Sequence, residues 1–164
     1  LTLSELDQYD ELPANTETDI NTICQLAYEV AKDNRQQGVE VFLELEREYL
    51  FILSNPERVS QALNNLAHNA AKFTTNGSIR IAYSVLEAEK KLEITVTDTG
   101  IGIPEEQQNV VFSRFYKADS FTQGTGLGLP ISRGVVEKLG GSLRIDSSYT
   151  GGCRIVLTLP LVYV

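Results

Sequence analysis

Two asparagines one helical turn apart, Asn65 and Asn69, are the first residues whose type and spacing indicate ligand chemistry. They lie in residues 54–74, where apolar residues recur at helical spacing and predict an amphipathic helix. Asparagine is a poor helix former because its amide competes for backbone hydrogen bonds. Amide oxygens are, however, ligands for a hard cation such as magnesium. This helix alone therefore leaves two alternatives open, a cation site and an ordinary amphipathic helix.

The rest of this helix must position the two amides. Ser54 and Asn55 are alternative caps for its N-terminus, and Pro56 suits its first turn. The apolar stripe that should face a core consists of Val59, Ala62, Leu63, Leu66, Ala70 and Phe73. The small and polar residues expected to face solvent are Ser60, Asn64, Ala67, His68 and Ala71.

A glycine-rich segment, GTGLGL at residues 124–129, begins a predicted helix over residues 127–139. Glycines let backbone amides approach an anion closely, and the helix N-terminus adds partial positive charge, so the segment predicts a phosphate cradle. A glycine hinge without a ligand is the alternative. The segment lacks the G-x-x-x-x-G-K-[ST] pattern and the strand and third glycine of a dinucleotide fingerprint. The H-R-D and D-F-G sequences of eukaryote-type kinases are also absent.

Asp98 ends a predicted strand and is followed by Gly100 and Gly102, which turn the chain away and leave the carboxylate facing a pocket. An enclosed carboxylate selects a ligand that donates to it, since an analogue without the donor leaves it unpaired. The exocyclic amine of adenine is such a donor. The same Asp-Thr-Gly sequence would fit half of an aspartic protease site, but that site needs two aspartates, so only a homodimer would complete it.

The composition limits the classes of function. The 164 residues are enough for one domain with its own core. A net charge of −8 argues against nucleic-acid binding, because a phosphate backbone needs a basic face. Cys24 and Cys153 stand apart from any Cys/His cluster, so we expect reduced thiols, a cytoplasmic setting and no zinc-type site. No apolar run is long enough to span a membrane, and no signal peptide opens the chain.

The order of predicted elements indicates the fold class. A first helix begins at Asp19 and ends by Gly38, and strands joined by hairpins alternate with helices after it. This order predicts an α+β fold, a two-layer α/β sandwich whose mixed, mostly antiparallel sheet carries the helices on one face. Residues 1–18 are expected to be a linker or a loosely docked lead-in. The predicted strands are residues 39–45, 49–53, 78–85, 92–97, 142–146 and 153–159, with a short helix at 104–108 and a loop of functional length at 111–124.

Taken together, these segments resemble the catalytic, ATP-binding domain of sensor histidine kinases. Its superfamily also includes DNA gyrase, the ninety-kilodalton heat-shock chaperones and the MutL repair proteins. The resemblance covers residues 19–161 and implies a Bergerat-type ATP-binding fold with three main helices on one face of the sheet. Its four boxes, in family order, are the N box at 58–74, DTGIGI at 98–103, VFSRFYKAD at 111–119 and GTGLGL at 124–129. The third glycine box departs from the family pattern, because GGCRI keeps the glycines but lacks the threonine and the aromatic residue.

The resemblance implies a role for individual residues. Asn69 and Asn65 would hold magnesium, Lys72 would contact phosphate or ribose, and Asp98 would accept from the adenine amine. The residues expected to act in phosphoryl transfer are Asn65, Lys72, Arg114 and Lys117. Lys117 stands where the family usually has arginine, which keeps the charge but loses the planar fork. The further implied nucleotide contacts are Phe73, Gly100, Gly102, Ile103, Tyr116, Lys117, Gly124, Thr125, Gly126, Leu127, Gly128 and Leu129.

The resemblance also implies an activity and partners. The domain, residues 19–164, would transfer the γ-phosphoryl group of Mg-ATP to a histidine on a separate dimerisation and phospho-acceptor domain. Residues 1–18 would be the linker or lead-in from that domain. A response regulator would act downstream. The isolated domain would be a monomer and the whole protein a homodimer, cytoplasmic or tethered to the inner membrane. The alternative is a nucleotide-sensing module that binds ATP without transfer.

Two residues weigh against other activities. Hydrolytic members of the superfamily carry glutamate at the position of Asn65, where it activates water, and an amide cannot act as that general base. His68 lacks the surroundings of an acceptor histidine and is expected to be a surface residue.

Overall fold

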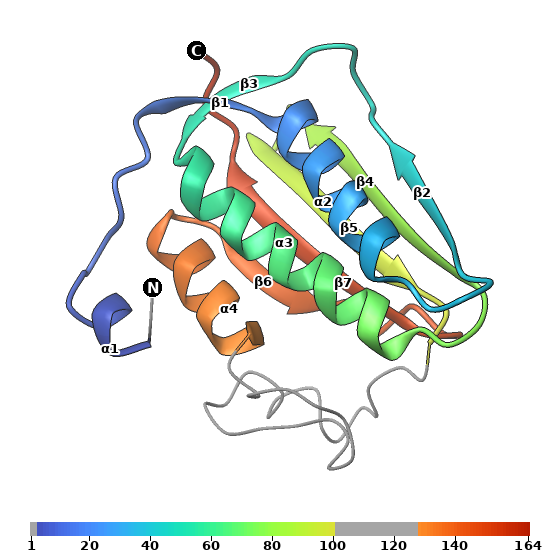
Figure 1. Cartoon of the computed structure of the whole chain (residues 1–164). Coiled ribbons are helices and arrows are strands. Elements are labelled where there is room, and N and C mark those ends of the chain that lie inside the picture. Colours follow the sequence, from blue (N-terminus) through green and yellow to red (C-terminus); the bar gives the residue numbers. More distant parts are fainter. Residues whose placement is uncertain (1–2, 101–127) are drawn as a thin grey trace.

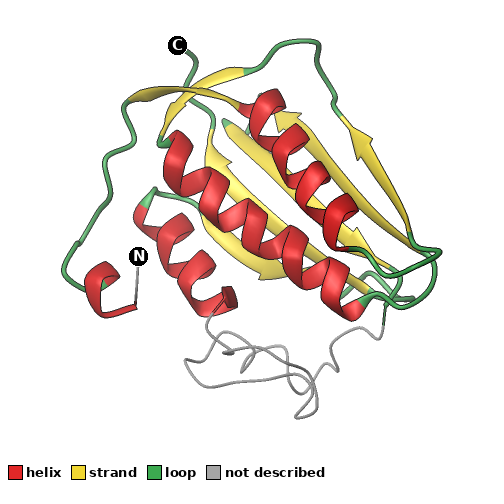
Figure 2. Cartoon of the chain, viewed as in Figure 1, coloured by secondary structure: helices red, strands yellow, loops and turns green. Residues whose placement is uncertain are grey.

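A computed structural model of the chain describes residues 3–100 and 128–164. A five-stranded sheet forms one layer, and three helices, α2 (Ile20–Asn34), α3 (Pro56–Phe73) and α4 (Gly128–Lys138), cover one of its faces (Figures 1 and 2). The predicted two-layer α+β fold is therefore confirmed. The strands, in spatial order, are β2 (Glu40–Glu44), β4 (Ser78–Leu86), β5 (Lys91–Asp98), β7 (Cys153–Pro160) and β6 (Ser142–Ile145).

The sheet is mixed and mostly antiparallel, as predicted. Among the strands of the described residues, only β2 and β4 run parallel, and β4, β5, β7 and β6 pair antiparallel in turn. Alternation along β4 and β5 decides which side chains face the helices, because successive residues of a strand point to opposite faces. Ile79, Ile81 and Ile94 are fully buried between the two layers, while Arg80 and Glu93 lie on the uncovered face.

Helix α3 lies between α2 and α4 and packs against both (Figure 1). Asn55, rather than Ser54, is its cap, since its side chain accepts from the backbone N–H of Arg58 at 3.1 Å. The prediction that Ala67 and Ala71 face solvent was wrong, because both alanines are fully buried. A helix with neighbours on two sides buries more than one stripe, and alanine lets those neighbours approach. His68 is exposed, as predicted.

Residues 3–19 pack closely on the rest of the described chain, whereas only loose docking was expected of this segment. Strand β1 (Thr16–Asp19) pairs antiparallel with β3 (Phe51–Ser54), and a short helix, α1 (Leu3–Leu6), lies against α4. The Leu6 side chain is 2% exposed and fills the space beside Gly134, where a Cβ would meet its Cδ2 at 2.4 Å. The backbone N–H of Leu12 also donates to the carbonyl of Lys138 at 2.9 Å.

The predicted short helix at 104–108 and the loop at 111–124 lie outside the described residues. Within the described part, no helix is both long and apolar enough to cross a membrane. Cys24 and Cys153 are buried free thiols.

Candidate functional site

Three segments converge at the C-terminal end of α3. The first residue of α4, Gly128, faces Asn69, since a Cβ added there would lie 3.7 Å from the amide nitrogen and 4.0 Å from the amide oxygen. The turn after β5 meets the same helix, because a Cβ on Gly100 would lie 2.6 Å from the Phe73 carbonyl oxygen and 3.0 Å from Asp98 Oδ1. The fold therefore places an amide, a carboxylate and a helix N-terminus around one region.

Asn65 and Asn69 both lie half-buried on α3, one turn apart. The Asn65 amide nitrogen donates to the hydroxyl of Ser132, on α4, at 3.2 Å. Asn69 faces the first turn of the same helix at Gly128. The two amides therefore lie along the junction of α3 and α4. Their side-chain oxygens are the type of ligand that a hard cation prefers. The described residues contain no group of three or more His, Cys, Asp and Glu side chains that could hold a metal instead.

Asp98 is the buried carboxylate of this region and is 8% exposed. Burial raises the pKa of its carboxyl group, and hydrogen bonds from the backbone N–H groups of Gly100 and Cys153 act in the opposite direction. The Gly100 N–H donates to Oδ1 at 2.8 Å. These two donors hold the carboxylate in a fixed orientation, so it can accept from a ligand amine in an enclosed setting.

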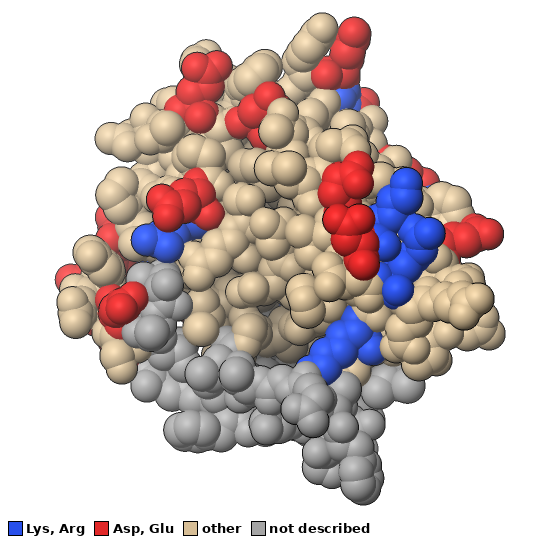
Figure 3. Space-filling view, viewed as in Figure 1, with Lys and Arg blue, Asp and Glu red and all other residues tan. Residues whose placement is uncertain are grey.

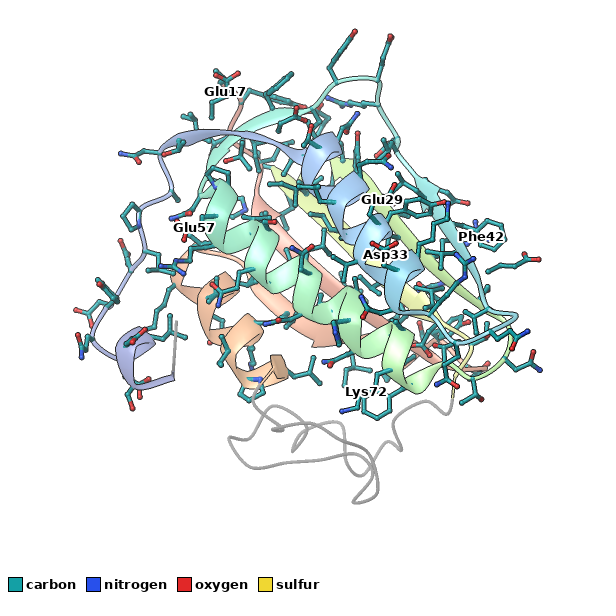
Figure 4. All side chains as sticks on the ribbon, viewed as in Figure 1. Glu17, Glu29, Asp33, Phe42, Glu57 and Lys72 are labelled. Atoms are coloured by element: carbon teal, nitrogen blue, oxygen red, sulfur yellow. The ribbon has the colours of Figure 1, made fainter. Side chains whose placement is uncertain are left out.

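Lys72 supplies local positive charge beside the amides. It is half-buried, its ammonium lies 5.6 Å from the centre of the Phe73 ring, and it sits near the C-terminal end of α3 in Figure 4. Its backbone carbonyl accepts from the Gln36 side chain at 3.0 Å, which ties this end of α3 to the segment after α2. In the space-filling view of Figure 3, the middle of the face carries no Lys, Arg, Asp or Glu, and the charged residues lie toward its edges.

Three supporting residues were not identified from the sequence. Thr99 fixes the turn after Asp98, since its Oγ1 accepts from the Ser78 N–H at 2.9 Å and donates to the Asn76 carbonyl at 3.1 Å. Gly77 makes room for that side chain, because a Cβ on it would lie 1.9 Å from Thr99 Oγ1. Ser132 joins α4 to Asn65. The Asn76-Gly77 turn signal was available for Gly77, but no local pattern pairs it with Thr99.

Of the other predicted site residues, Leu129 is half-buried and packs against the core, next to Gly128 at the start of α4. The residues that lie outside the described part of the chain are Gly102, Ile103, Arg114, Tyr116, Lys117, Gly124, Thr125, Gly126 and Leu127.

A family model, described as histidine kinase-, DNA gyrase B-, and HSP90-like ATPase, matches residues 54–163, which include α3, the turn after β5 and α4. The chain belongs to this ATPase family. Among its relatives, the autoinducer 2 sensor kinase/phosphatase LuxQ of Vibrio cholerae is 42% identical over 119 residues, which cover 69% of this chain and 14% of LuxQ. The chain spans 13% to 21% of the length of the curated sensor kinases compared with it.

Solved sensor histidine kinase domains share this fold over most of the chain. The mycobacterial sensor histidine kinase MprB superposes with a TM-score of 0.79 at 26% identity, covering 92% of this chain and 99% of that one. The catalytic domain of the histidine kinase ThkA superposes with a TM-score of 0.74 at 29% identity, covering 90% and 97% of the two chains. Within the ATPase family, this chain is a catalytic domain of the sensor histidine kinase type, which confirms the resemblance and the fold.

Proposed function

We propose that this chain binds Mg-ATP and transfers the γ-phosphoryl group to a histidine on a separate dimerisation and phospho-acceptor domain. The observation that most supports this proposal is the convergence of Asn69, Gly128 and the buried Asp98 around the end of α3. Phosphoryl transfer asks a protein mainly to position its substrates and neutralise charge, and these groups suit both tasks.

The residues present fit magnesium and a nucleotide. The half-buried amides of Asn65 and Asn69 would hold magnesium, which neutralises negative charge on the phosphates when bound. Asp98 would accept from the exocyclic amine of adenine, and Lys72 would contact phosphate or ribose. The N-terminus of α4, beside Asn69, would donate backbone N–H groups to phosphate oxygens. Arg114 and Lys117 would add positive charge from the predicted loop at 111–124.

Asn65 favours transfer over hydrolysis. An amide does not take a proton from water, so ATP bound here would be hydrolysed slowly without an acceptor. We expect the isolated domain to be a cytoplasmic monomer, and residues 1–18 to lead from the acceptor domain of a homodimeric protein. A response regulator would then take the phosphoryl group from the acceptor histidine.

The decisive experiment combines the purified chain with γ-labelled ATP, magnesium and a helical hairpin that carries the acceptor histidine. We expect acid-labile label on the hairpin, and none on a hairpin whose histidine is replaced by alanine. Nucleotide binding without transfer would replace the kinase proposal with a nucleotide-sensing module. Absence of Mg-ATP binding, measured by calorimetry on folded protein, would overturn both proposals.

A further inference from the structure

Ser132 connects the two helices that border the candidate site. It lies on α4, is fully buried, and its hydroxyl makes two contacts with α3. The hydroxyl donates to the Ala62 carbonyl oxygen at 3.5 Å and accepts from the Asn65 amide nitrogen at 3.2 Å. The family comparison does not give this residue a role, and the sequence provides no motif for it.

The chemistry of the hydroxyl fixes the direction of both contacts. A serine hydroxyl has one proton to donate and lone pairs that accept. A backbone carbonyl can only accept, so in the long 3.5 Å contact with Ala62 the serine hydroxyl is the donor. In the shorter contact, at 3.2 Å, an N–H of Asn65 donates to the serine oxygen. A carbonyl oxygen of Asn65 in that place would meet a lone pair, so the other orientation of the amide is disfavoured.

We propose that Ser132 is a positioning residue that selects the orientation of the Asn65 amide, so that its oxygen, and not its nitrogen, is presented as a ligand to magnesium. Only the oxygen of an amide can coordinate a hard cation, so the wrong orientation gives no metal ligand. This inference rests on the proposed function and extends it to a residue behind the site.

Helix α4 also contacts the second amide, that of Asn69. Helix α4 begins at Gly128 beside Asn69 and carries Ser132 one turn further on, beside Asn65. A shift of α4 relative to α3 would therefore change the surroundings of both asparagines together. Residues in the layer behind metal ligands commonly change affinity by about ten- to a hundredfold when they are replaced.

The test compares Ser132→Ala with the native chain by calorimetric titration of a non-hydrolysable ATP analogue, in magnesium and in EDTA. We expect Ser132→Ala to weaken binding in magnesium by about tenfold and to leave binding in EDTA unchanged, because only the metal requires the amide oxygen. Ser132→Thr, which keeps the hydroxyl, should restore the affinity. Ser54→Ala removes a similarly buried hydroxyl from β3 and should bind as the native chain does.

A second variant separates orientation from packing. A carboxylate has two equivalent oxygens, so either can face the metal. In an Asn65→Asp background, Ser132→Ala should therefore lower the nucleotide affinity in magnesium by less than about twofold, and a double-mutant cycle would measure this. In the nucleotide-free protein, NMR should show distinct, slowly exchanging Asn65 side-chain N–H signals that Ser132→Ala removes. Thermal melting checks that each variant folds, and Ser132→Cys, a weaker acceptor of similar size, replaces the alanine variant if it does not.

The outcomes separate this inference from the function on which it rests. Equal affinity losses in magnesium and in EDTA, or an undiminished loss in the Asn65→Asp background, would show a packing role and overturn the inference alone. Unchanged Asn65 signals in Ser132→Ala would also overturn it. A native chain that binds no nucleotide would overturn the proposed function, and the inference with it.

Discussion

Gly152 packs directly against the main chain of Asp98. A Cβ added to Gly152 would lie 1.9 Å from the Asp98 carbonyl oxygen and 2.8 Å from the Cα of Thr99. The next residue, Cys153, pairs with Asp98 in the register of β5 and β7, and its N–H donates to the Asp98 carboxylate. The third glycine box, which lacks the family threonine and aromatic residue, thus still supports the carboxylate through its backbone.

Replacing Gly152 by alanine should displace the Asp98 turn. Backbone atoms cannot yield to a Cβ at this distance, so we expect a loss of about 1–3 kcal/mol in the free energy of unfolding, together with weaker nucleotide binding. Urea denaturation and calorimetric titration would measure the two effects. Gly151→Ala is the matched control, because no atom lies within 4 Å of its added Cβ and only its positive φ of 103° opposes alanine. That control should lose about 1 kcal/mol and keep its affinity, and equal affinity losses would contradict the role of Gly152.

Asn69→Ala should remove most of the magnesium-dependent part of nucleotide affinity. Losing a charge-assisted contact of about 2 kcal/mol corresponds to a roughly thirtyfold weaker Kd in magnesium, with little change in EDTA. The control is Asn64→Ala on the same helix, whose buried side-chain oxygen lacks a partner among the described residues. Asn64→Ala should therefore bind normally and melt no lower than the native chain. A native-like magnesium dependence in Asn69→Ala would contradict the assigned metal ligand.

The buried carboxyl of Asp98 should make stability depend on pH in a defined direction. Burial raises its pKa in the folded chain above the value in the unfolded chain, so the folded state holds the proton more tightly. Below the unfolded pKa, about 4, Asp98 adds no pH dependence. As the pH rises from there through the folded pKa, the native chain should lose stability relative to Asp98→Asn. Urea denaturation of both proteins across this range measures the difference, and a native chain that gains relative stability with pH would refute it.

The two thiols should be unreactive while the chain is folded. Burial raises the pKa of Cys24 to about 12, and burial together with the charge of Asp98 raises that of Cys153 to about 12. The thiolate is the reactive form, and little of it exists at pH 8. Iodoacetamide followed by mass spectrometry should find neither cysteine labelled in the native chain and both labelled in urea. Rapid labelling of folded Cys153 would show that the Asp98 region is open to solvent.

The sequence predicted those parts of the fold that depend on local periodicity. The alternation of apolar and polar residues along 78–98 predicted the hairpin correctly, and the helical spacing of apolar residues in 54–74 predicted α3. Both patterns follow from the geometry of a single element. The asparagines and Asp98 could be selected because their residue types are unusual in those positions. The convergence of Asn69, Gly128 and Asp98 was implied by the resemblance and is visible in the structure.

The features that were missed depend on contacts between distant elements. Ala67 and Ala71 were assigned to solvent because one helix cannot reveal that it has two neighbours. Ser132 and Thr99 act through hydrogen bonds to residues far away in the chain, and serine and threonine are common in any surface segment. The close packing of the N-terminal segment was not predicted, because Leu6 meets its partner, Gly134, only when α4 lies beside it.

The pairing of β1 with β3 decides where this domain can be cut. A recombinant fragment starting at Asp19, where the first predicted helix begins, would remove three of the four residues that pair with β3 and the leucine that covers Gly134. The exposed N–H and C=O groups of β3 would then be available to other molecules, and such strand edges promote aggregation. In expression trials, we therefore expect non-aggregated protein only from fragments that retain residues 3–18.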